Sequence, residues 1–430
     1  MMNCNLIGRF LMSEYIISGG RPLVGHVRVD GAKNSVLPIL CACLLCDEGF
    51  VTLSNCPRIT DVQYTLEILK LFGCETSFTD GQIYVNSENS RFCGIPCDLV
   101  GRMRSAALFL GATIGRFHRA EQCRPGGCEL GSRPIDLHLS AFAKMGLSVS
   151  DTGMEVKCSG CPHGADIFLR YPSVGATENI MLAACRGKGT VTVTNAAREP
   201  EIEDLQNFIN SMGGKISGAG SGIIIIEGVE KLHGVDYNII GDRIEAATYL
   251  AAAIATDGEV TVSGVCPSHL TAVTDLIVNS GGSVCRKHDS ITASRGGQFI
   301  LSPGKVETSP YPGFPTDAQS LIMAMLLRAA GTTEIHEGVF DDRLRVSFEF
   351  IKMGADITVS GRTAYVHGTE RLYGARVFAG DLRSGAALVI AALSAQGESV
   401  VKNISHIERG YDGFETKLRG LGGNIIKLKD

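Results

Sequence analysis

Ala246-Ala247-Thr248-Tyr249-Leu250-Ala251-Ala252-Ala253-Ile254-Ala255 is the stretch that decides the fold. A helix of this composition has no polar face, so it must be buried on every side. The β-branched strand Gly258-Glu259-Val260-Thr261-Val262 follows it, and an amphipathic helix then runs to Gly281. A glycine is typical of the C-terminal end of a helix. A buried helix, a strand and an outer helix therefore make up one unit.

The same unit recurs along the chain. Its strand is repeated at residues 49–53, 189–193, 331–335 and 397–401, and a degenerate sixth copy follows Gly111-Ala112-Thr113-Ile114. The glycines that end the outer helices are Gly73, Gly146, Gly213, Gly281, Gly354 and Gly422. Self-similarity at a nearly fixed period means that each copy repeats one supersecondary solution. The sequence therefore predicts six structural repeats.

The helices of a unit differ in character, which predicts their layers. Apolar helices are expected at residues 35–45, 105–114, 176–185, 246–255, 318–327 and 385–395. Outer helices such as 62–72 and 205–212 have one charged face, and a hairpin is expected at 355–366. Six buried helices are too many for one small core. We expect an α/β fold of two globules with three units each, helices inside and sheets outside. A solenoid is the alternative, but long buried helices disfavour it.

The globules divide the chain discontinuously. We expect residues 12–32 together with 241–430 to form the first globule, and residues 33–240 to form the second. Residues 1–11 are expected to be an extension without a fold, because their apolar stretch is very short.

The composition excludes several classes of protein. A formal charge of −5 and a pI of about 6.1 do not suit a surface that coats nucleic acid. No apolar run is long enough for a membrane span. Fifteen cysteines without dense, regular spacing favour a reducing cytoplasm. The pair in Cys158-Ser159-Gly160-Cys161 has the spacing of a zinc half-site, but no second half-site is evident.

One cysteine differs from the rest in its setting. Cys128 lies in the glycine-rich loop Arg124-Pro125-Gly126-Gly127-Cys128-Glu129-Leu130-Gly131-Ser132-Arg133-Pro134, with a cation on either side. A thiol near guanidinium groups ionises more easily and can meet a substrate. The alternative is a surface turn with an incidental cysteine, and spacing alone leaves both readings open.

Charged residues stand at the expected N-termini of the buried helices. They include Lys33, Arg104, Arg243, Asp317 and Arg383. Charge at the end of a buried helix is costly unless it is paired or meets a ligand, and helix N-termini bind anions. These ends therefore predict a phosphate-binding cleft between the globules. Ion pairs that tie the globules together, such as Asp381 with Arg383, are the alternative for any single residue.

Taken together, these segments resemble the UDP-N-acetylglucosamine 1-carboxyvinyltransferase family, also called UDP-N-acetylglucosamine enolpyruvyl transferases. The resemblance runs from about residue 15 to the C-terminus. Its specific segments are Gly31-Ala32-Lys33-Asn34, Met103-Arg104, Pro125-Gly126-Gly127-Cys128, Arg133-Pro134-Ile135-Asp136-Leu137-His138, Ser173-Val174-Gly175-Ala176-Thr177, Asn195-Ala196-Ala197-Arg198-Glu199-Pro200-Glu201, Phe314-Pro315-Thr316-Asp317, Asp381-Leu382-Arg383 and Arg409-Gly410-Tyr411.

The resemblance implies a pair of inside-out α/β barrels and a reaction. The enolpyruvyl group of phosphoenolpyruvate would pass to the sugar 3′-hydroxyl, the first committed step of peptidoglycan synthesis. Cys128 would donate a proton and add covalently to phosphoenolpyruvate, and Asp317 would be the general base. The residues implied to bind phosphoenolpyruvate are Lys33, Asn34, Arg133 and Arg409, with Lys33 and Arg409 also counted as catalytic.

The resemblance also implies a site for the nucleotide sugar. Its residues would be Arg104, Arg133, Pro134, Ile135, Asp136, Leu137, Tyr171, Pro172, Ser173, Val174, Asp317 and Val339. The chain departs from the family pattern at Gly101-Arg102, where Lys-Thr is frequent, and at Tyr171, where Lys is common. No metal, cofactor, nucleic acid or membrane is implied, and a cytoplasmic monomer is expected.

Two other functions remain open at this level. The shikimate-pathway enolpyruvyl transferase shares the fold and resembles the rest of this chain, but that enzyme does not have the cysteine loop. A catalytically weak paralogue that binds the nucleotide sugar and regulates cell-wall synthesis is the second. An intact set of candidate catalytic residues favours an active enzyme.

Overall fold

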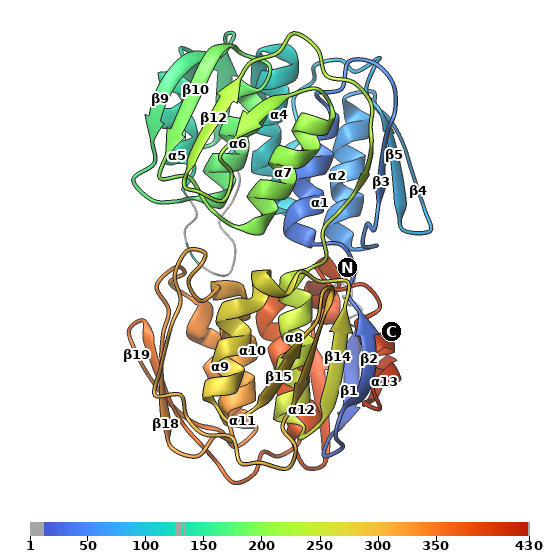
Figure 1. Cartoon of the computed structure of the whole chain (residues 1–430), viewed down its shortest axis with the longest axis vertical. Helices are drawn as coiled ribbons and strands as arrows, with labels where there is room; N and C mark the ends of the chain where they lie inside the picture. The colour runs from blue at the N-terminus through green and yellow to red at the C-terminus, as the bar shows by residue number, and fades with distance from the viewer. Residues whose placement is uncertain (1–12, 125–130, 132–133, 429–430) are drawn as a thin grey trace, which may run out of the picture.

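Six buried helices occupy the centre of the molecule, three in each of two stacked globules (Figure 1). The structure is a computed structural model that describes residues 13–124, 131 and 134–428, so the predicted extension at 1–11 lies outside it. The upper globule holds α1 (Lys33–Cys43), α4 (Leu108–Phe117) and α6 (Val174–Ala184). The lower one holds α8 (Arg243–Ala255), α10 (Thr316–Leu326) and α12 (Leu382–Ser394).

The predicted buried helices are confirmed, and their starts are informative. Every residue of α8 is buried, as the absence of a polar face predicts. Five of the six helices begin two or three residues before the predicted range, so the charged residues lie inside the first turn. The second helix differs. A 3-10 turn, η1 (Arg104–Ala107), precedes α4, and a short helix α3 (Cys97–Arg102) that was not predicted precedes η1.

Amphipathic helices and three small sheets surround each helical core (Figure 1). The outer helices are α2 (Thr60–Leu71), α5 (Asp136–Lys144), α7 (Pro200–Ser211), α9 (Thr271–Asn279), α11 (Val346–Lys352) and α13 (Phe414–Gly420). The upper sheets have the orders β13-β3-β5-β4, β6-β8-β7 and β11-β12-β10-β9. The lower sheets have the orders β21-β22-β1-β23, β15-β16-β14-β2 and β17-β18-β20-β19. Helices inside and sheets outside are the predicted arrangement.

The strands are short and lie in both halves of the chain. Those of the upper globule are β3 (Val51–Ser54), β4 (Glu75–Thr79), β5 (Gln82–Asn86), β6 (Arg119–Cys123), β7 (Ser148–Asp151), β8 (Glu155–Ser159), β9 (His163–Phe168), β10 (Lys188–Thr194), β11 (Lys215–Ser217), β12 (Ile223–Glu227) and β13 (Asp236–Asn238). Those of the lower globule are β1 (Glu14–Ser18), β2 (Val24–Arg28), β14 (Glu259–Ser263), β15 (Ser283–Arg286), β16 (Ser290–Ser294), β17 (Lys305–Glu307), β18 (Thr332–His336), β19 (Asp356–Ser360), β20 (Thr363–His367), β21 (Arg376–Phe378), β22 (Glu398–Lys402) and β23 (Asn424–Leu428).

One sheet shows how a unit is built. β17 and β18 are parallel neighbours, and α10 connects them in the sequence. β18 pairs antiparallel with β20. The predicted hairpin is present as β19 and β20, with Asp356 opposite His367. The outer helix α11 ends just before the expected left-handed glycine, Gly354, at φ +88°.

The first and last strands of the described residues meet in the lower globule. β1 pairs antiparallel with both β22 and β23, so that Tyr15 lies between Val401 and Lys427. The lower core takes residues 15–29 and 244–425, whereas the upper core takes residues 36–239. The chain therefore crosses between the cores twice, and the finer boundaries at 32/33 and 240/241 stay a prediction.

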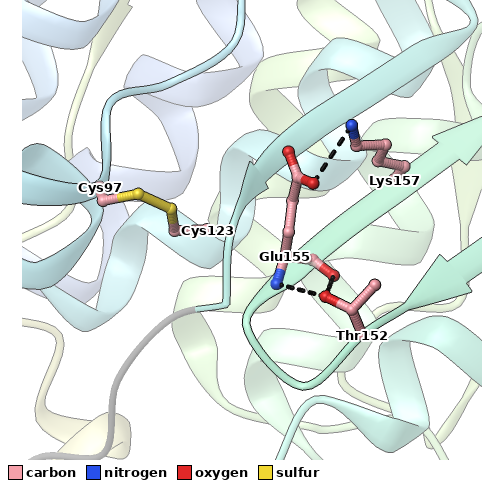
Figure 2. Close-up of a disulfide and its surroundings, with 5 residues drawn as sticks. All are labelled: Cys97, Cys123, Thr152, Glu155 and Lys157. Carbon is pink, nitrogen blue, oxygen red and sulfur yellow. Dashed lines mark hydrogen bonds and ion pairs between the residues drawn. A yellow bond between two sulfur atoms is a disulfide. The ribbon is translucent and has the colours of Figure 1, made fainter.

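One disulfide departs from the expectation of reduced thiols. Cys97, the first residue of α3, is bonded to Cys123, the last residue of β6, with their Cα atoms 5.2 Å apart (Figure 2). The other cysteines of the described chain are free thiols. Sequence spacing did not suggest the pair, because 26 residues and one buried helix separate the two positions.

Candidate active site

The N-terminal ends of the buried helices face one another where the two globules meet. Lys33 begins α1 of the upper globule, and its backbone N–H donates to Asp242 Oδ2, beside α8 of the lower globule, at 3.1 Å. Asn34 Nδ2 donates to Asp317 Oδ2, in the first turn of α10, at 3.4 Å. Polar groups at the helix ends thus connect the globules directly.

Lys33 and Arg409 share one carboxylate. Lys33 Nζ lies 2.7 Å from Asp61 Oδ2, and the side chain of Asp61 is only 3% exposed. Arg409 ends η4 (Ile404–Arg409), and its Nε and Nη2 donate to the two oxygens of Asp61 at 2.9 and 3.3 Å. The structure therefore brings together two of the cations predicted to bind phosphoenolpyruvate, although 376 positions separate them in the chain.

Asp317 is held by a buried arginine. Arg343, in η3 (Arg343–Arg345), donates from Nη2 to Asp317 Oδ1 at 2.7 Å and lies 3.7 Å from Asp381 Oδ1. The Arg343 side chain is 1% exposed, whereas that of Asp317 is 30% exposed. Asp317 is thus positioned on one side and remains accessible on the other.

A second buried arginine lies on the neighbouring helix. Arg383 packs over the ring of Tyr411, with 5.3 Å between its Cζ and the ring centroid. Burial opposes its charge, but Tyr411, Asp317 and Asp242 outweigh this and raise its pKa. Within the described residues, Arg383 Nη1 and Arg343 Nε are buried donors without a hydrogen-bond partner. Buried donors are normally satisfied, so these two suit an anionic ligand between the globules.

Arg243 does not join this cation group. Its Nε and Nη2 donate to the carboxylate of Glu201, on α7, at 2.9 and 3.3 Å. Both side chains are buried, and they belong to different globules. For this residue the alternative interpretation, an ion pair that ties the globules together, fits the geometry. Asp381 caps α12 by accepting the N–H groups of Arg383 and Ser384.

A second group of predicted residues lies in the upper globule. Ile135 and Leu137 pack into its core around the start of α5, and Asp136 pairs with Arg170. His138 follows and is buried, and burial with the nearby charge of Arg104 lowers its pKa to about 3. Its Nδ1 lies 2.8 Å from the amide nitrogen of Asn179.

The start of α6 borders this group. Ser173 caps the helix by accepting the N–H of Ala176 at 3.3 Å, and Val174 is its first residue. A Cβ placed on Gly175 would lie 3.3 Å from Cε1 of His138, so α6 and α5 approach closely here. The segments with Arg104, Ile135 to Leu137, and Ser173 are therefore neighbours in space.

Two predicted contacts extend toward the lower globule. Tyr171 is 41% exposed, and its pKa is raised by burial and by the charges of Glu199 and Glu337. Val339 donates its N–H to Glu337 Oε1 at 2.8 Å, and Glu337 also accepts the hydroxyl of Thr316. Tyr171 and the half-buried Pro172 thus belong to the upper globule and Val339 to the lower one. Tyr171 and Val339 both lie near the carboxylate of Glu337.

Several residues stand outside these groups or were not predicted. Cys128 and Arg133 lie outside the described residues, and Pro134 beside them is exposed. Asp61 was not predicted, and neither Arg343 nor Arg383 was assigned to a substrate, although Arg383 was counted among the charged helix ends of the predicted cleft. A charged helix end marks Arg383 in the sequence, but nothing local marks Asp61, whose partners lie on α1 and η4.

A family model described as EPSP synthase (3-phosphoshikimate 1-carboxyvinyltransferase) matches residues 17–418. The fold is therefore that of a carboxyvinyltransferase, and the protein is a transferase. More narrowly, the chain belongs to the UDP-N-acetylglucosamine 1-carboxyvinyltransferase family, as its relatives show.

The relatives cover nearly the whole chain. UDP-N-acetylglucosamine 1-carboxyvinyltransferase 2 of Caldanaerobacter subterraneus subsp. tengcongensis is 45% identical over 97% of this chain and 100% of its own. UDP-N-acetylglucosamine 1-carboxyvinyltransferase of Endomicrobium trichonymphae is 45% identical over 96% of this chain and 99% of its own. Among solved structures, the enolpyruvyl transferase NikO from Streptomyces tendae has a TM-score of 0.87 at 25% identity, covering 98% of this chain and 100% of its own. EPSP synthase from Acinetobacter baumannii, at 16% identity and TM-score 0.74 over 97% and 100%, shares the fold.

Proposed function

We propose that this protein transfers the enolpyruvyl group of phosphoenolpyruvate to the 3′-hydroxyl of UDP-N-acetylglucosamine and releases phosphate, the first committed step of peptidoglycan synthesis. The observation that carries the proposal is the convergence of Lys33, Arg343, Arg383 and Arg409 around Asp317 and Asp61 where the globules meet. Relatives at 42 to 45% identity are named for this acceptor and this transfer.

Phosphoenolpyruvate has two anionic groups, which suits the two sets of donors. Lys33 and Arg409 are proposed to hold the phosphate together with Arg133, and Asn34 lies beside Lys33. The buried donors of Arg343 and Arg383 suit the carboxylate, because a guanidinium binds a carboxylate through two parallel hydrogen bonds.

The proposed chemistry needs one acid and one base. The Cys128 thiol protonates the methylene carbon of phosphoenolpyruvate, and the sugar oxygen bonds to the adjacent carbon as Asp317 takes the hydroxyl proton. The product of this addition is a tetrahedral ketal. The Cys128 thiolate left by the first step then takes back a methyl proton, which restores the double bond as the carbon–oxygen bond to phosphate breaks, and the surrounding cations stabilise the leaving charge. The exposed side of Asp317 allows a hydroxyl to approach.

The nucleotide sugar is proposed to lie along the second group of residues. One region of the globule junction is bordered by these residues: Arg104, residues 134–137 around the start of α5, residues 171–174 before α6, and Val339. Tyr171 and Gly101, where the chain departs from the family pattern, would lie near the diphosphate. They are the first positions to examine if affinity for the nucleotide proves low.

Phosphate release from phosphoenolpyruvate tests the proposal. We expect release with UDP-N-acetylglucosamine and none with shikimate 3-phosphate. Release with shikimate 3-phosphate alone would overturn the acceptor while keeping the reaction class. No release with either, together with tight binding of the nucleotide sugar, would identify a binding-only paralogue.

We further propose a cytoplasmic monomer that needs no metal or cofactor. Both substrates are charged small molecules, and most described cysteines are free thiols. Among the described helices, none combines the length and the apolar character of a membrane span. Light scattering after size exclusion measures the oligomeric state, and a mass near 45.7 kDa is expected.

A further inference from the structure

Asp61 is a buried carboxylate to which the proposed chemistry gives no role. It is the second residue of α2, and its side chain is 3% exposed. Each of its oxygens faces a cation: Oδ2 lies 2.7 Å from Lys33 Nζ, and Oδ1 accepts from Arg409 Nε at 2.9 Å. These are two of the cations assigned above to the phosphate of the substrate.

The local charge balance depends on this carboxylate. Burial alone would raise the pKa of Asp61, but Lys33 and Arg409 outweigh burial and lower it. Burial lowers the pKa of Lys33. The positive charges of Arg409 and Arg383 lower it further, and the negative charge of Asp61 opposes both effects. Asp61 is therefore the counter-ion that opposes the loss of the Lys33 charge in a region rich in cations.

Asp61 also lies at a connection between the globules. Three residues before it, the backbone N–H of Arg58 donates to Asp412 Oδ2 at 2.8 Å. The hydroxyl of Thr60 donates to the carbonyl of Glu408 at 3.4 Å. The start of α2 in the upper globule is thus attached to the segment around η4 in the lower one. Arg409 is held at this attachment by the Asp61 carboxylate.

We propose that Asp61 is a positioning residue that sets the affinity of the Lys33–Arg409 pair for phosphate. Its oxygens accept from the same donors that a phosphate would use, so an entering phosphate must weaken the bonds to Asp61. Asp61 holds the two cations in place before the substrate arrives and limits how tightly the phosphate product is retained. The inference rests on the proposed function, in which this pair binds the phosphate group.

The decisive measurement is the dissociation constant of inorganic phosphate, determined by calorimetry on the full chain without any other substrate. In Asp61→Asn, which keeps the shape and removes the charge, we expect phosphate to bind about tenfold more tightly, because one charged competitor is lost. Asp61→Glu keeps the charge and is expected to stay within about threefold of the wild type. Binding is measured directly, so it does not depend on the identity of the acceptor.

Turnover supplies a second readout that a purely structural role would not give. Slower phosphate departure predicts that Asp61→Asn lowers kcat and lowers KM for phosphoenolpyruvate together, whereas loss of fold lowers activity without tighter binding. Glu67→Gln is the matched control, because Glu67 is on the same helix and 52% exposed. It is expected to leave both constants unchanged.

Defined outcomes would overturn the inference. Wild-type protein that binds no phosphate, or Asp61→Asn that folds and binds phosphate as the wild type does, would each refute it. Asp412→Asn, which removes the neighbouring bond to Arg58, should leave phosphate affinity unchanged, and an equal shift there would assign the effect to the attachment of the globules. If circular dichroism shows Asp61→Asn to be unfolded, a tenfold change in folded Asp61→Glu would refute the role of charge.

Discussion

Arg343 fixes Asp317 from within the lower globule, with 2.7 Å between Nη2 of the arginine and Oδ1 of the aspartate. The arginine is almost fully buried, and the same guanidinium reaches Asp381 at the start of α12. One cation therefore sets the position of a carboxylate on α10 relative to the N-terminus of α12. The opposite oxygen of Asp317 accepts from Asn34 of the upper globule.

Asp317→Asn should lower kcat by about a hundredfold or more, because a general base contributes rate factors of this size and an amide cannot take the hydroxyl proton. The amide keeps the shape of the side chain, so folding should be retained. Phosphate release with saturating substrates measures the effect, and Asp356→Asn, at an exposed position of β19, is the control. An Asp317→Asn rate close to that of the wild type would remove Asp317 as the base.

Cys128→Ala should abolish or strongly reduce turnover while the protein stays folded, because the proposed acid is lost. An epoxide mimic of phosphoenolpyruvate, such as fosfomycin, should alkylate Cys128 alone. Intact-mass spectrometry followed by peptide mapping locates the adduct. Cys266 and Cys285 are exposed free thiols and are the internal controls. An adduct on either of them, or none at all, would contradict the assignment of Cys128.

The stability of the fold should fall in acid because of His138. Its pKa is about 3 in the folded protein and 6.5 ordinarily, so the unfolded chain binds more protons between these values. The free energy of unfolding should therefore decrease as the pH falls below 6.5, by up to about 1.4 kcal/mol per pH unit from this residue.

Urea unfolding at pH 7.5 and pH 5 measures this change. His138→Asn retains an acceptor near Nδ1 and should lose that part of the pH dependence, whereas exposed His288→Asn should behave as the wild type does. Equal pH dependence in His138→Asn and the wild type would show that His138 is not the titrating group.

Loss of the bond between Cys97 and Cys123 should lower the free energy of unfolding by roughly 3 kcal/mol, the value expected for closing a loop of this length. Cys97→Ser and the reduced wild type should show the same decrease. Cys161→Ser, which changes a half-buried free thiol, is the control. An oxidised wild type no more stable than Cys97→Ser would contradict the prediction.

The fold could be predicted from the sequence because its signals are local and repeated. An all-apolar helix, a β-branched strand and a terminal glycine recur in each unit, and each depends only on neighbouring residues. Where the repeat is degenerate, the prediction was less exact: η1 takes the place of the expected start of the second buried helix, and α3 before it was not predicted.

Only those candidate site residues that are marked by their local sequence could be predicted. Lys33 and Asp317 were found at charged helix ends, which local sequence shows. Asp61 and the bond of Cys97 to Cys123 depend on contacts between distant segments, and no periodicity records these. For Arg243 the sequence left a ligand contact and an ion pair between the globules both open, because a helix end does not reveal what lies opposite; the structure pairs it with Glu201.

The pairing of β1 with β22 and β23 bears on how the chain is synthesised. The upper core is continuous from 36 to 239 and is complete while the ribosome is still translating the second half. The lower core needs β1 and β23 together, so residues 14–18 must wait until residues 424–428 have been synthesised. Helix ends from both globules build the candidate site, so the site can form only after β23 has been synthesised.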